Sequence, residues 1–223
     1  MTPSEAARLP IWLRLAVAQG ITAPVIYLGV IVVGGARRPG YSHLHQAVSE
    51  LTEAGAPDRV GLNIALAVME LLTVAFGLGY FVAVRQVDRH LAASAALMVV
   101  IGVAGLGFAR FPMDPVDAPI TFDGGMHLVL VSISAVAAIA AVLLAALGWR
   151  RVQGTRGLGV FSFAMLAAMV ASGVISGYVG ANGGPGIGVW QRINTGAFGL
   201  WQVATALFLL QRGAMLPGPR PQA

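Results

Sequence analysis

The sequence predicts an all-α membrane protein, a polytopic bundle of six transmembrane helices with a short amphipathic helix in its first outer loop. Of its 223 residues, 57% are hydrophobic and only 10% are charged, whereas soluble domains carry about 25% charged residues. Six apolar stretches are long enough to cross a bilayer core, which takes roughly 20 helical residues. No stretch alternates polar and apolar residues as a membrane barrel strand does, so the expected spans are helices.

The six expected spans are separated by arginines, prolines and glycine pairs, which typically interrupt helices. They cover about residues 12–34, 61–84, 91–109, 126–148, 158–180 and 193–211. The first span exceeds the apolar core of about 7–15 residues in a signal peptide, so we expect it to be a helix of the folded protein. The chain 1–223 thus forms a single transmembrane domain, and residues 212–223 form a disordered cytoplasmic tail.

The placement of arginines predicts the orientation. All 14 basic residues are arginine, and cytoplasmic loops of membrane proteins carry an excess of basic residues. With both termini inside, nine arginines fall on the inner side and five on the outer side. We therefore expect a multi-pass protein of the cell membrane with cytoplasmic N- and C-termini. The arginines lie at the ends of apolar segments and not on a polar domain, so no nucleic-acid partner is expected.

Small residues mark one face of the fifth span. Ala168, Ser172, Ser176 and Gly180 recur every four residues, and helices in lipid approach closely where such residues meet. This face is expected to form a seam within the chain, with a homodimer through the same face as the alternative.

The first outer loop holds most of the uncommon polar residues. Its segment 44–51 places apolar residues at helical spacing, which is typical of a short amphipathic helix. Such a helix either lies in the membrane interface or closes the top of the bundle. In the second case it directs Ser49 and Glu50 inward.

Polar residues from several loop–helix junctions are expected on the same outer rim, where they could line a ligand-binding pocket. The candidates are Glu50, Asn63, Asp114, His127 and Arg192. Deeper in the second span, Glu70 lies on the same helical face as Asn63. A charged side chain at this depth costs about 2.5–3.5 kcal/mol on insertion scales, so Glu70 should be neutral or paired and face the interior.

Metal binding and serine chemistry are the two catalytic hypotheses. His43 and His45 resemble half of a zinc site that His127 could complete, but on a helix their two rings point about 200° apart. We therefore expect no metal and no other cofactor. Ser49 has His45 four residues before it and could use His127 as its base, with an acid such as Asp114 to orient that base. No Gly-x-Ser-x-Gly turn surrounds Ser49.

Four stretches, in order, resemble one known family. They read GYSHLHQAVSELTEAGAPDRVGLN, FPMDP, TFDGGMHLVL and WQRIN, and together they are similar to domain-of-unknown-function family 998 over roughly residues 12–211. The resemblance is strongest at residues 49–51, at Asn63, at residues 111–114 and at the Gly-x-x-His that ends at His127. It implies a small bacterial or archaeal membrane protein of six helices, with a more distant architectural likeness to Frag/DRAM/Sfk-type proteins.

The resemblance also bears on the candidate residues. It favours Ser49, Glu50, Asn63, Asp114 and His127 as the structural or functional focus. His43 and His45 do not belong to the family pattern, which counts against the zinc hypothesis.

The sequence favours binding or handling of a membrane lipid or another amphiphile through an outward-facing polar pocket. In this interpretation Arg110 and Arg192 meet an anionic headgroup. Two alternatives stay open. One is a membrane-embedded hydrolase that uses His127 with Ser49 or an acidic residue, and the other is a small transporter or accessory subunit with Glu70 as its proton-linked acid.

Overall fold

The computed structural model describes residues 9–182 and 184–212, and within these ranges the chain is entirely helical apart from turns and loops. The six long helices are α1 Ile11–Arg37, α2 Arg59–Val84, α3 Arg89–Leu106, α4 Phe122–Arg151, α5 Arg156–Ala181 and α6 Ile187–Arg212. All six are long and apolar enough to cross a membrane. The expected fold class is thereby confirmed, and the chain is a polytopic membrane protein. Residues 213–223 of the expected tail lie outside the described ranges.

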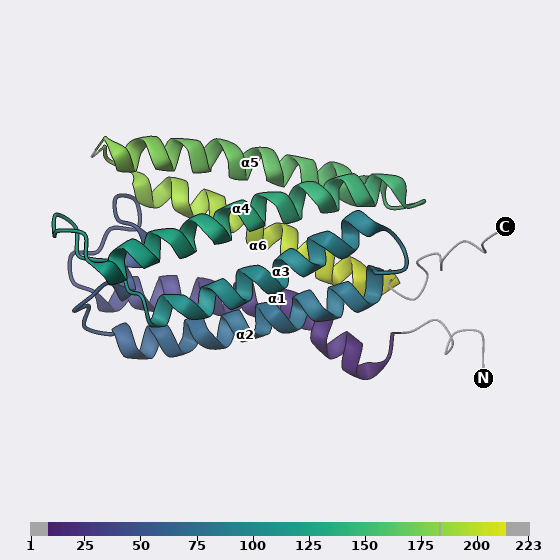
Figure 1. The fold of residues 1–223 in the computed structure, drawn as a ribbon, viewed down its shortest axis with the longest axis horizontal. Coiled ribbons are helices and arrows are strands. Elements are labelled where there is room, and N and C mark those ends of the chain that lie inside the picture. The colour runs from purple at the N-terminus through teal and green to yellow at the C-terminus, as the bar shows by residue number, and fades with distance from the viewer. Residues whose placement is uncertain (1–8, 183, 213–223) are drawn as a thin grey trace.

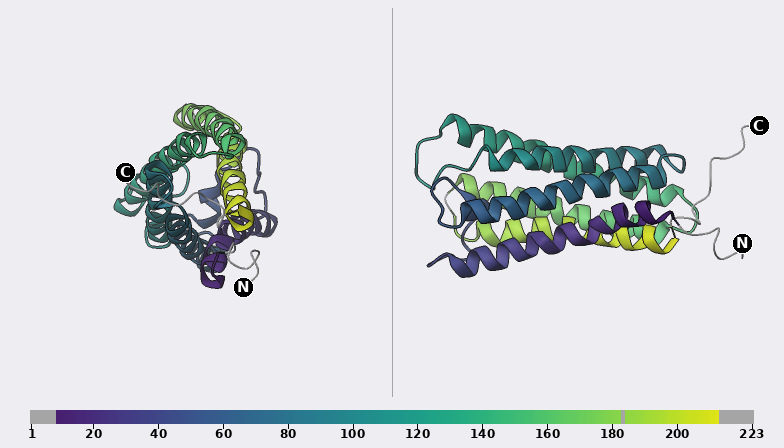
Figure 2. Two further views of the ribbon diagram at one scale, coloured as in Figure 1. Left: turned by 90° about the vertical axis from the view of Figure 1, so that its right-hand side faces the viewer. Right: turned by 90° about the horizontal axis from the view of Figure 1, so that it is seen from below.

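The helices form a ring. Each one packs against the next along the chain, and α6 closes the ring against α1, as the view along the bundle in Figure 2 shows. The two long loops, 38–58 and 107–121, lie at one end of the bundle, here called the loop end (Figure 1). The start of α1, the end of α6 and the short connections 85–88 and 152–155 lie at the other, the turn end. The orientation of these ends in the membrane stays a prediction.

Several helices extend beyond the apolar spans expected for them. Helix α4 begins at Phe122, because the Thr121 hydroxyl accepts a hydrogen bond from the Gly124 amide and caps the first turn. Helix α6 begins at Ile187, directly after Gly186, whose positive φ of 91° ends the preceding turn. The first turns of α6 contain Gln191 and Arg192, so an apolar window places its start too late.

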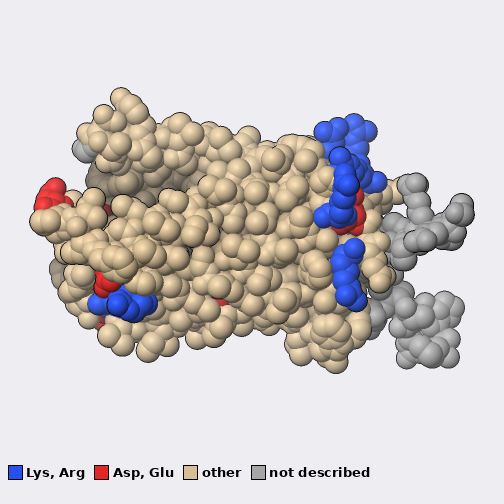
Figure 3. Space-filling model, in the orientation of Figure 1, with Lys and Arg blue, Asp and Glu red and all other residues tan. Residues whose placement is uncertain are grey.

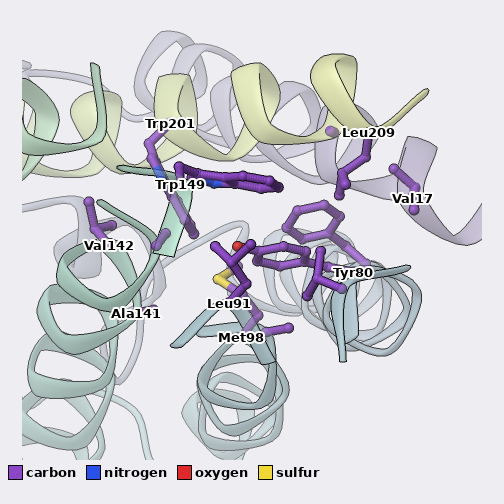
Figure 4. Close-up of a cluster of buried hydrophobic side chains, with 14 of the residues drawn as sticks. Val17, Tyr80, Leu91, Met98, Ala141, Val142, Trp149, Trp201 and Leu209 are labelled. Carbon is purple, nitrogen blue, oxygen red and sulfur yellow. The ribbon is translucent and has the colours of Figure 1, made fainter. Parts of the chain in front are cut away.

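Most of the hydrophobic core lies in one half of the bundle along its length. The largest fully buried side chains include Trp149, Trp201, Tyr80 and Phe76. Figure 4 shows Trp149, Trp201 and Tyr80 close together, and Trp149 and Tyr80 lie near the turn ends of α4 and α2. The ring of Tyr80 stacks on Phe76 and on Trp149. In the loop half, the buried apolar cluster among the described residues is small: Val30, Leu51 and Leu62. The bundle is therefore tightly packed near the turn end and loosely filled near the loop end.

The expected amphipathic helix in the first long loop is shorter than its sequence pattern suggests. It is a five-residue 3₁₀ helix, η1, Val48–Thr52. Leu51 is buried, between α1 and α2, whereas Leu44 is 58% exposed. The segment before η1 is held in turns by hydrogen bonds from the Ser42 amide to the Gln46 side chain and from the Tyr41 hydroxyl to the Ala47 carbonyl.

Candidate functional site

Arg192 fastens the first long loop to α6. Its guanidinium donates hydrogen bonds to the Gln46 carbonyl at 3.0 Å, to the Gly188 carbonyl at 2.9 Å and to the Tyr41 hydroxyl at 2.7 Å. Burial raises the pKa of the Tyr41 hydroxyl, and the hydrogen bond and positive charge of Arg192 oppose that rise. Gly188 is required here, because a Cβ atom would overlap the carbonyl oxygen of Gln46. Arg192 is thus engaged within the protein.

Glu50 is buried and organises η1. Its carboxylate accepts hydrogen bonds from the Ala47 amide and from the Gln46 side chain, both at 2.7 Å. Arg38 donates to the Glu50 carbonyl and pairs with the Glu53 carboxylate at 2.6 Å. Carboxylates that accept backbone amides in this way stabilise a helix start. Glu50 therefore serves the local fold of the loop.

The two long loops meet at Met113. The Ala54 amide donates to the Met113 carbonyl at 2.9 Å, and the Ser49 hydroxyl lies 3.0 Å from the Met113 sulfur. We call residues 38–58 and 110–121 the cap. Its two parts contact each other across the loop end and so cover part of the ring.

Asp114 and His127 support the second part of the cap. The carboxylate of Asp114 accepts the amide and the hydroxyl of Thr121, each at 2.8 Å, and it lies so close to Gly124 that a Cβ there would overlap it. His127 is buried at the start of α4, where its Nδ1 lies 3.0 Å from the Phe111 carbonyl and its ring packs on Phe108. Both side chains fix the loop onto α4.

The candidate residues do not form one hydrogen-bonded constellation among the described residues. Ser49 contacts Met113 and makes no hydrogen bond with His127. Asn63 is half-buried near the start of α2 and takes part in no side-chain hydrogen bond in the described ranges. Glu70 lies farther along α2 and is buried against α3.

The histidines of the first loop lie at the surface. His43 and His45 are exposed, and His43 contacts Gly35 of α1 and the guanidinium of Arg192. Within residues 9–182 and 184–212, no group of three or more His, Cys, Asp or Glu side chains could hold a metal ion.

Arg110 also has an internal partner. Its guanidinium pairs with the Asp123 carboxylate at 3.0 Å, with the Arg110 side chain 68% exposed and the Asp123 side chain 38% exposed. The two arginines expected to meet an anionic headgroup, Arg110 and Arg192, thus both have partners within the protein.

Sequence reasoning missed the residues that join the cap to the helices over long sequence distances. Gln191 accepts the Val48 amide at 3.0 Å, and Arg38 reaches Glu53. One signal was available: Gln46 and Glu50 are four residues apart, a spacing at which side chains on one helical turn meet.

Helices α4 and α5 diverge toward the loop end, as Figure 1 shows. Leu128, Ala135, Val142 and Trp149 lie seven residues apart on one face of α4. Val142 and Trp149 are fully buried, whereas Ala135 is exposed and Leu128 is 54% exposed. The same face of one helix thus passes from buried to exposed along its length.

Helix α5 shows the same change. Near the turn end, a Cβ atom at Gly159 would contact the backbone of α4. Two heptads on, Gly173 is exposed and only the Asn194 side chain lies near it, and Gly177 has open space around its Cβ position. An opening therefore separates α4 from α5 in the loop half, and Figure 3 shows a hollow in the surface near the loop end.

The opening is apolar with a few polar groups at its edge. Val131 on α4 and Val170 on α5 are 43% and 42% exposed. Asn194 of α6 lies beside Gly173 and donates to the Met169 carbonyl at 2.6 Å. Of the expected row Ala168, Ser172, Ser176 and Gly180, Ser172 is buried and Gly180 faces Ile187 of α6. Apolar walls with sparse polar groups are typical of sites for amphiphilic ligands.

Comparison with curated proteins and with solved structures finds no similar chain. A family model does match: that of the proteins of unknown function named DUF998, over residues 21–208. This range includes all of the cap and most of the six helices. The chain is therefore a polytopic membrane protein that belongs to the DUF998 family.

Proposed function

We propose that the protein binds a membrane lipid or a similar amphiphile in the opening between the loop halves of α4 and α5. The observation that carries this proposal is the change from buried to exposed along the facing sides of both helices. In a bilayer, a gap between two membrane helices is open to acyl chains from the side. An apolar chain there would cover Leu128, Val131 and Val170, each of which is more than 40% exposed.

Three arginines at the loop end support a ligand with an uncharged polar head. Arg38, Arg110 and Arg192 are all paired within the protein, so an anionic headgroup would have to displace those partners. At the edge of the opening, the Asn194 amide offers uncharged hydrogen-bonding groups. Neutral donors and acceptors suit hydroxyl or amide heads.

We further propose that the loop end faces the outside and the turn end faces the cytoplasm. Figure 3 shows a band of basic residues in blue near the turn end. The exposed arginines at this end include Arg85, Arg89, Arg150, Arg151 and Arg156. An excess of basic residues marks the cytoplasmic side of membrane proteins. The amphiphile site then lies in the outer leaflet.

Photolabelling tests the site. The probe is a monoacylglycerol, whose head carries only hydroxyl groups, with a photoreactive acyl chain, added to purified protein in a neutral detergent. Labels are expected on residues 128–135 and 170–177. In the variant Ala135→Trp a large ring occupies the opening, and labelling of those peptides should fall several-fold. In the control, Leu78→Trp, the ring is added at a lipid-facing position on α2 that is 54% exposed. Equal labelling of all lipid-facing helices, unaffected by Ala135→Trp, would contradict the proposal.

Cysteine labelling tests the orientation. The chain contains no cysteine, so single-cysteine variants report one position each. A membrane-impermeant maleimide should label Ala118→Cys in intact cells and label Gln153→Cys only after permeabilisation. The reverse pattern would overturn the orientation while leaving the lipid site to its own test.

A further inference from the structure

Glu70 lies in the middle of the membrane-spanning part of α2. It is eleven residues after Arg59, where the helix begins, and fourteen before Val84, where it ends. At about 1.5 Å per residue, these distances are roughly 16 Å and 21 Å along the helix axis. The side chain is only 9% exposed. An acid at this depth is far from the water at either end.

Two glycines of α3 make room for this side chain. A Cβ atom at Gly105 would overlap the carboxyl group of Glu70. A Cβ atom at Gly102 would lie 2.8 Å from the backbone carbonyl oxygen of the same residue. The carboxyl group therefore rests in a notch that exists because α3 has glycine at both positions. Any larger residue at 105 would have to displace it.

The described residues provide no counter-charge for Glu70. Their ion pairs use other acids, namely Asp58, Glu53, Asp88 and Asp123, and no side-chain hydrogen bond within residues 9–182 and 184–212 includes its carboxylate. The facing part of α3 is glycine.

Tyr27 of α1 is a titratable group that interacts electrostatically with Glu70. His127 of α4 is bound to the Phe111 carbonyl, and Arg192 of α6 is bound to the cap. A buried carboxylate without a partner is unstable relative to its neutral acid.

From this geometry we infer that Glu70 is a proton-binding site in the membrane interior. Its carboxyl group holds a proton in the structure described here, and a cation or hydrogen-bond donor placed beside it would favour release of that proton. The site is separate from the opening between α4 and α5, because Glu70 lies at the contact of α2 with α3. The inference about Glu70 is therefore independent of amphiphile binding.

A hydrophobic carbodiimide tests this inference. Dicyclohexylcarbodiimide dissolves in the apolar phase, and a protonated carboxylic acid adds across one of its C=N bonds. The O-acylisourea that forms rearranges to a stable N-acylurea without a leaving group, so the peptide gains the mass of one reagent molecule. The label on Glu70 should exceed the label on Glu50 or Glu53 by about tenfold or more, because the apolar surroundings disfavour the charged acid and so favour the protonated form that reacts. Rising pH should reduce the labelling rate.

Matched variants complete the experiment. Glu70→Gln keeps the shape of the side chain and should lose the label, whereas Glu50→Gln in the cap should keep it. A water-soluble carbodiimide should label Glu70 far more slowly than the hydrophobic reagent. Equal labelling rates with both reagents would overturn the inference. So would the absence of a label on Glu70 in folded wild-type protein. Gly105→Ala should lower the labelling rate because it displaces the carboxyl group, and an unchanged rate would show that the notch is not the reacting site.

Discussion

Replacing Arg192 by alanine should detach the first part of the cap from α6. Its guanidinium donates three hydrogen bonds, to the Gln46 carbonyl, the Tyr41 hydroxyl and the Gly188 carbonyl, and it also lies 3.1 Å from His43 Nδ1. Two of them join the loop to the helix, and the third lies within α6.

The size of the effect follows from these contacts. A hydrogen bond to a charged group contributes about 1.5–3 kcal/mol. Because these groups are only half-buried, the two bonds that join loop and helix are taken at the low end of that range, so Arg192→Ala should lower the free energy of unfolding by about 3 kcal/mol.

Arg110→Ala is the matched control. Arg110 is likewise at the loop end and pairs with Asp123, but its side chain is 68% exposed. Exposed ion pairs contribute about 0–1 kcal/mol, so this variant should unfold almost as the wild type does. The assay is unfolding of detergent-purified protein in increasing sodium dodecyl sulfate, followed by tryptophan fluorescence. If the two variants lost equal stability, the role of Arg192 as the main cap attachment would be refuted.

Three further perturbations have defined outcomes. Gly20→Ala should destabilise the bundle by about 1–3 kcal/mol through overpacking, because the added Cβ would lie 2.6 Å from the ring of Phe76. Gly29 has open space around its Cβ position, so Gly29→Ala should be neutral in the same unfolding assay. Asp88→Ala should cost about 1 kcal/mol by thermal unfolding, because its carboxylate caps α3 by accepting the amides of His90 and Leu91; an unchanged melting temperature would argue against the cap. Burial raises the pKa of the Tyr41 hydroxyl above its value in the unfolded chain, so the folded protein keeps this proton to a higher pH. The free energy of unfolding should therefore fall as pH rises above about 10, where the unfolded side chain ionises. Tyr41→Phe should lack this part of the pH dependence, and an identical profile would contradict it.

The membrane architecture was predictable because it depends on composition. Apolar stretches of sufficient length fix the number of helices, whatever their packing. The helix ends were less predictable, since Thr121 and Gly186 set them in polar sequence outside the apolar windows. The contact of Glu50 with Gln46 could be predicted, because the two residues are four apart. The bond of Arg38 to Glu53 in the same loop joins residues fifteen apart, and no local sequence pattern indicates it.

The opening between α4 and α5 could not be predicted from the sequence. The opening contains ordinary lipid-facing residue types, such as Val131, Ala135 and Gly177. The composition of a helix is the same whether such residues face lipid or an opening on the inner side. The notch at Glu70 is a different case. The sequence indicated that this acid needs a partner or a proton, and only the packing against Gly105 shows where its carboxyl group lies.

The uneven core has a consequence for how the chain tolerates substitution. Ala141 and Ala145 of α4 are fully buried beside Trp149 in the filled half of the ring, where added volume forces neighbouring side chains out of place. Ala135, two turns earlier on the same helix, is exposed and has room for a larger residue. A saturation scan along the face of α4 that carries Leu128, Ala135, Val142 and Trp149 should therefore divide near the midpoint of the helix. Large apolar residues should be accepted before it and rejected after it, so the boundary of the rigid half could be located from expression levels alone.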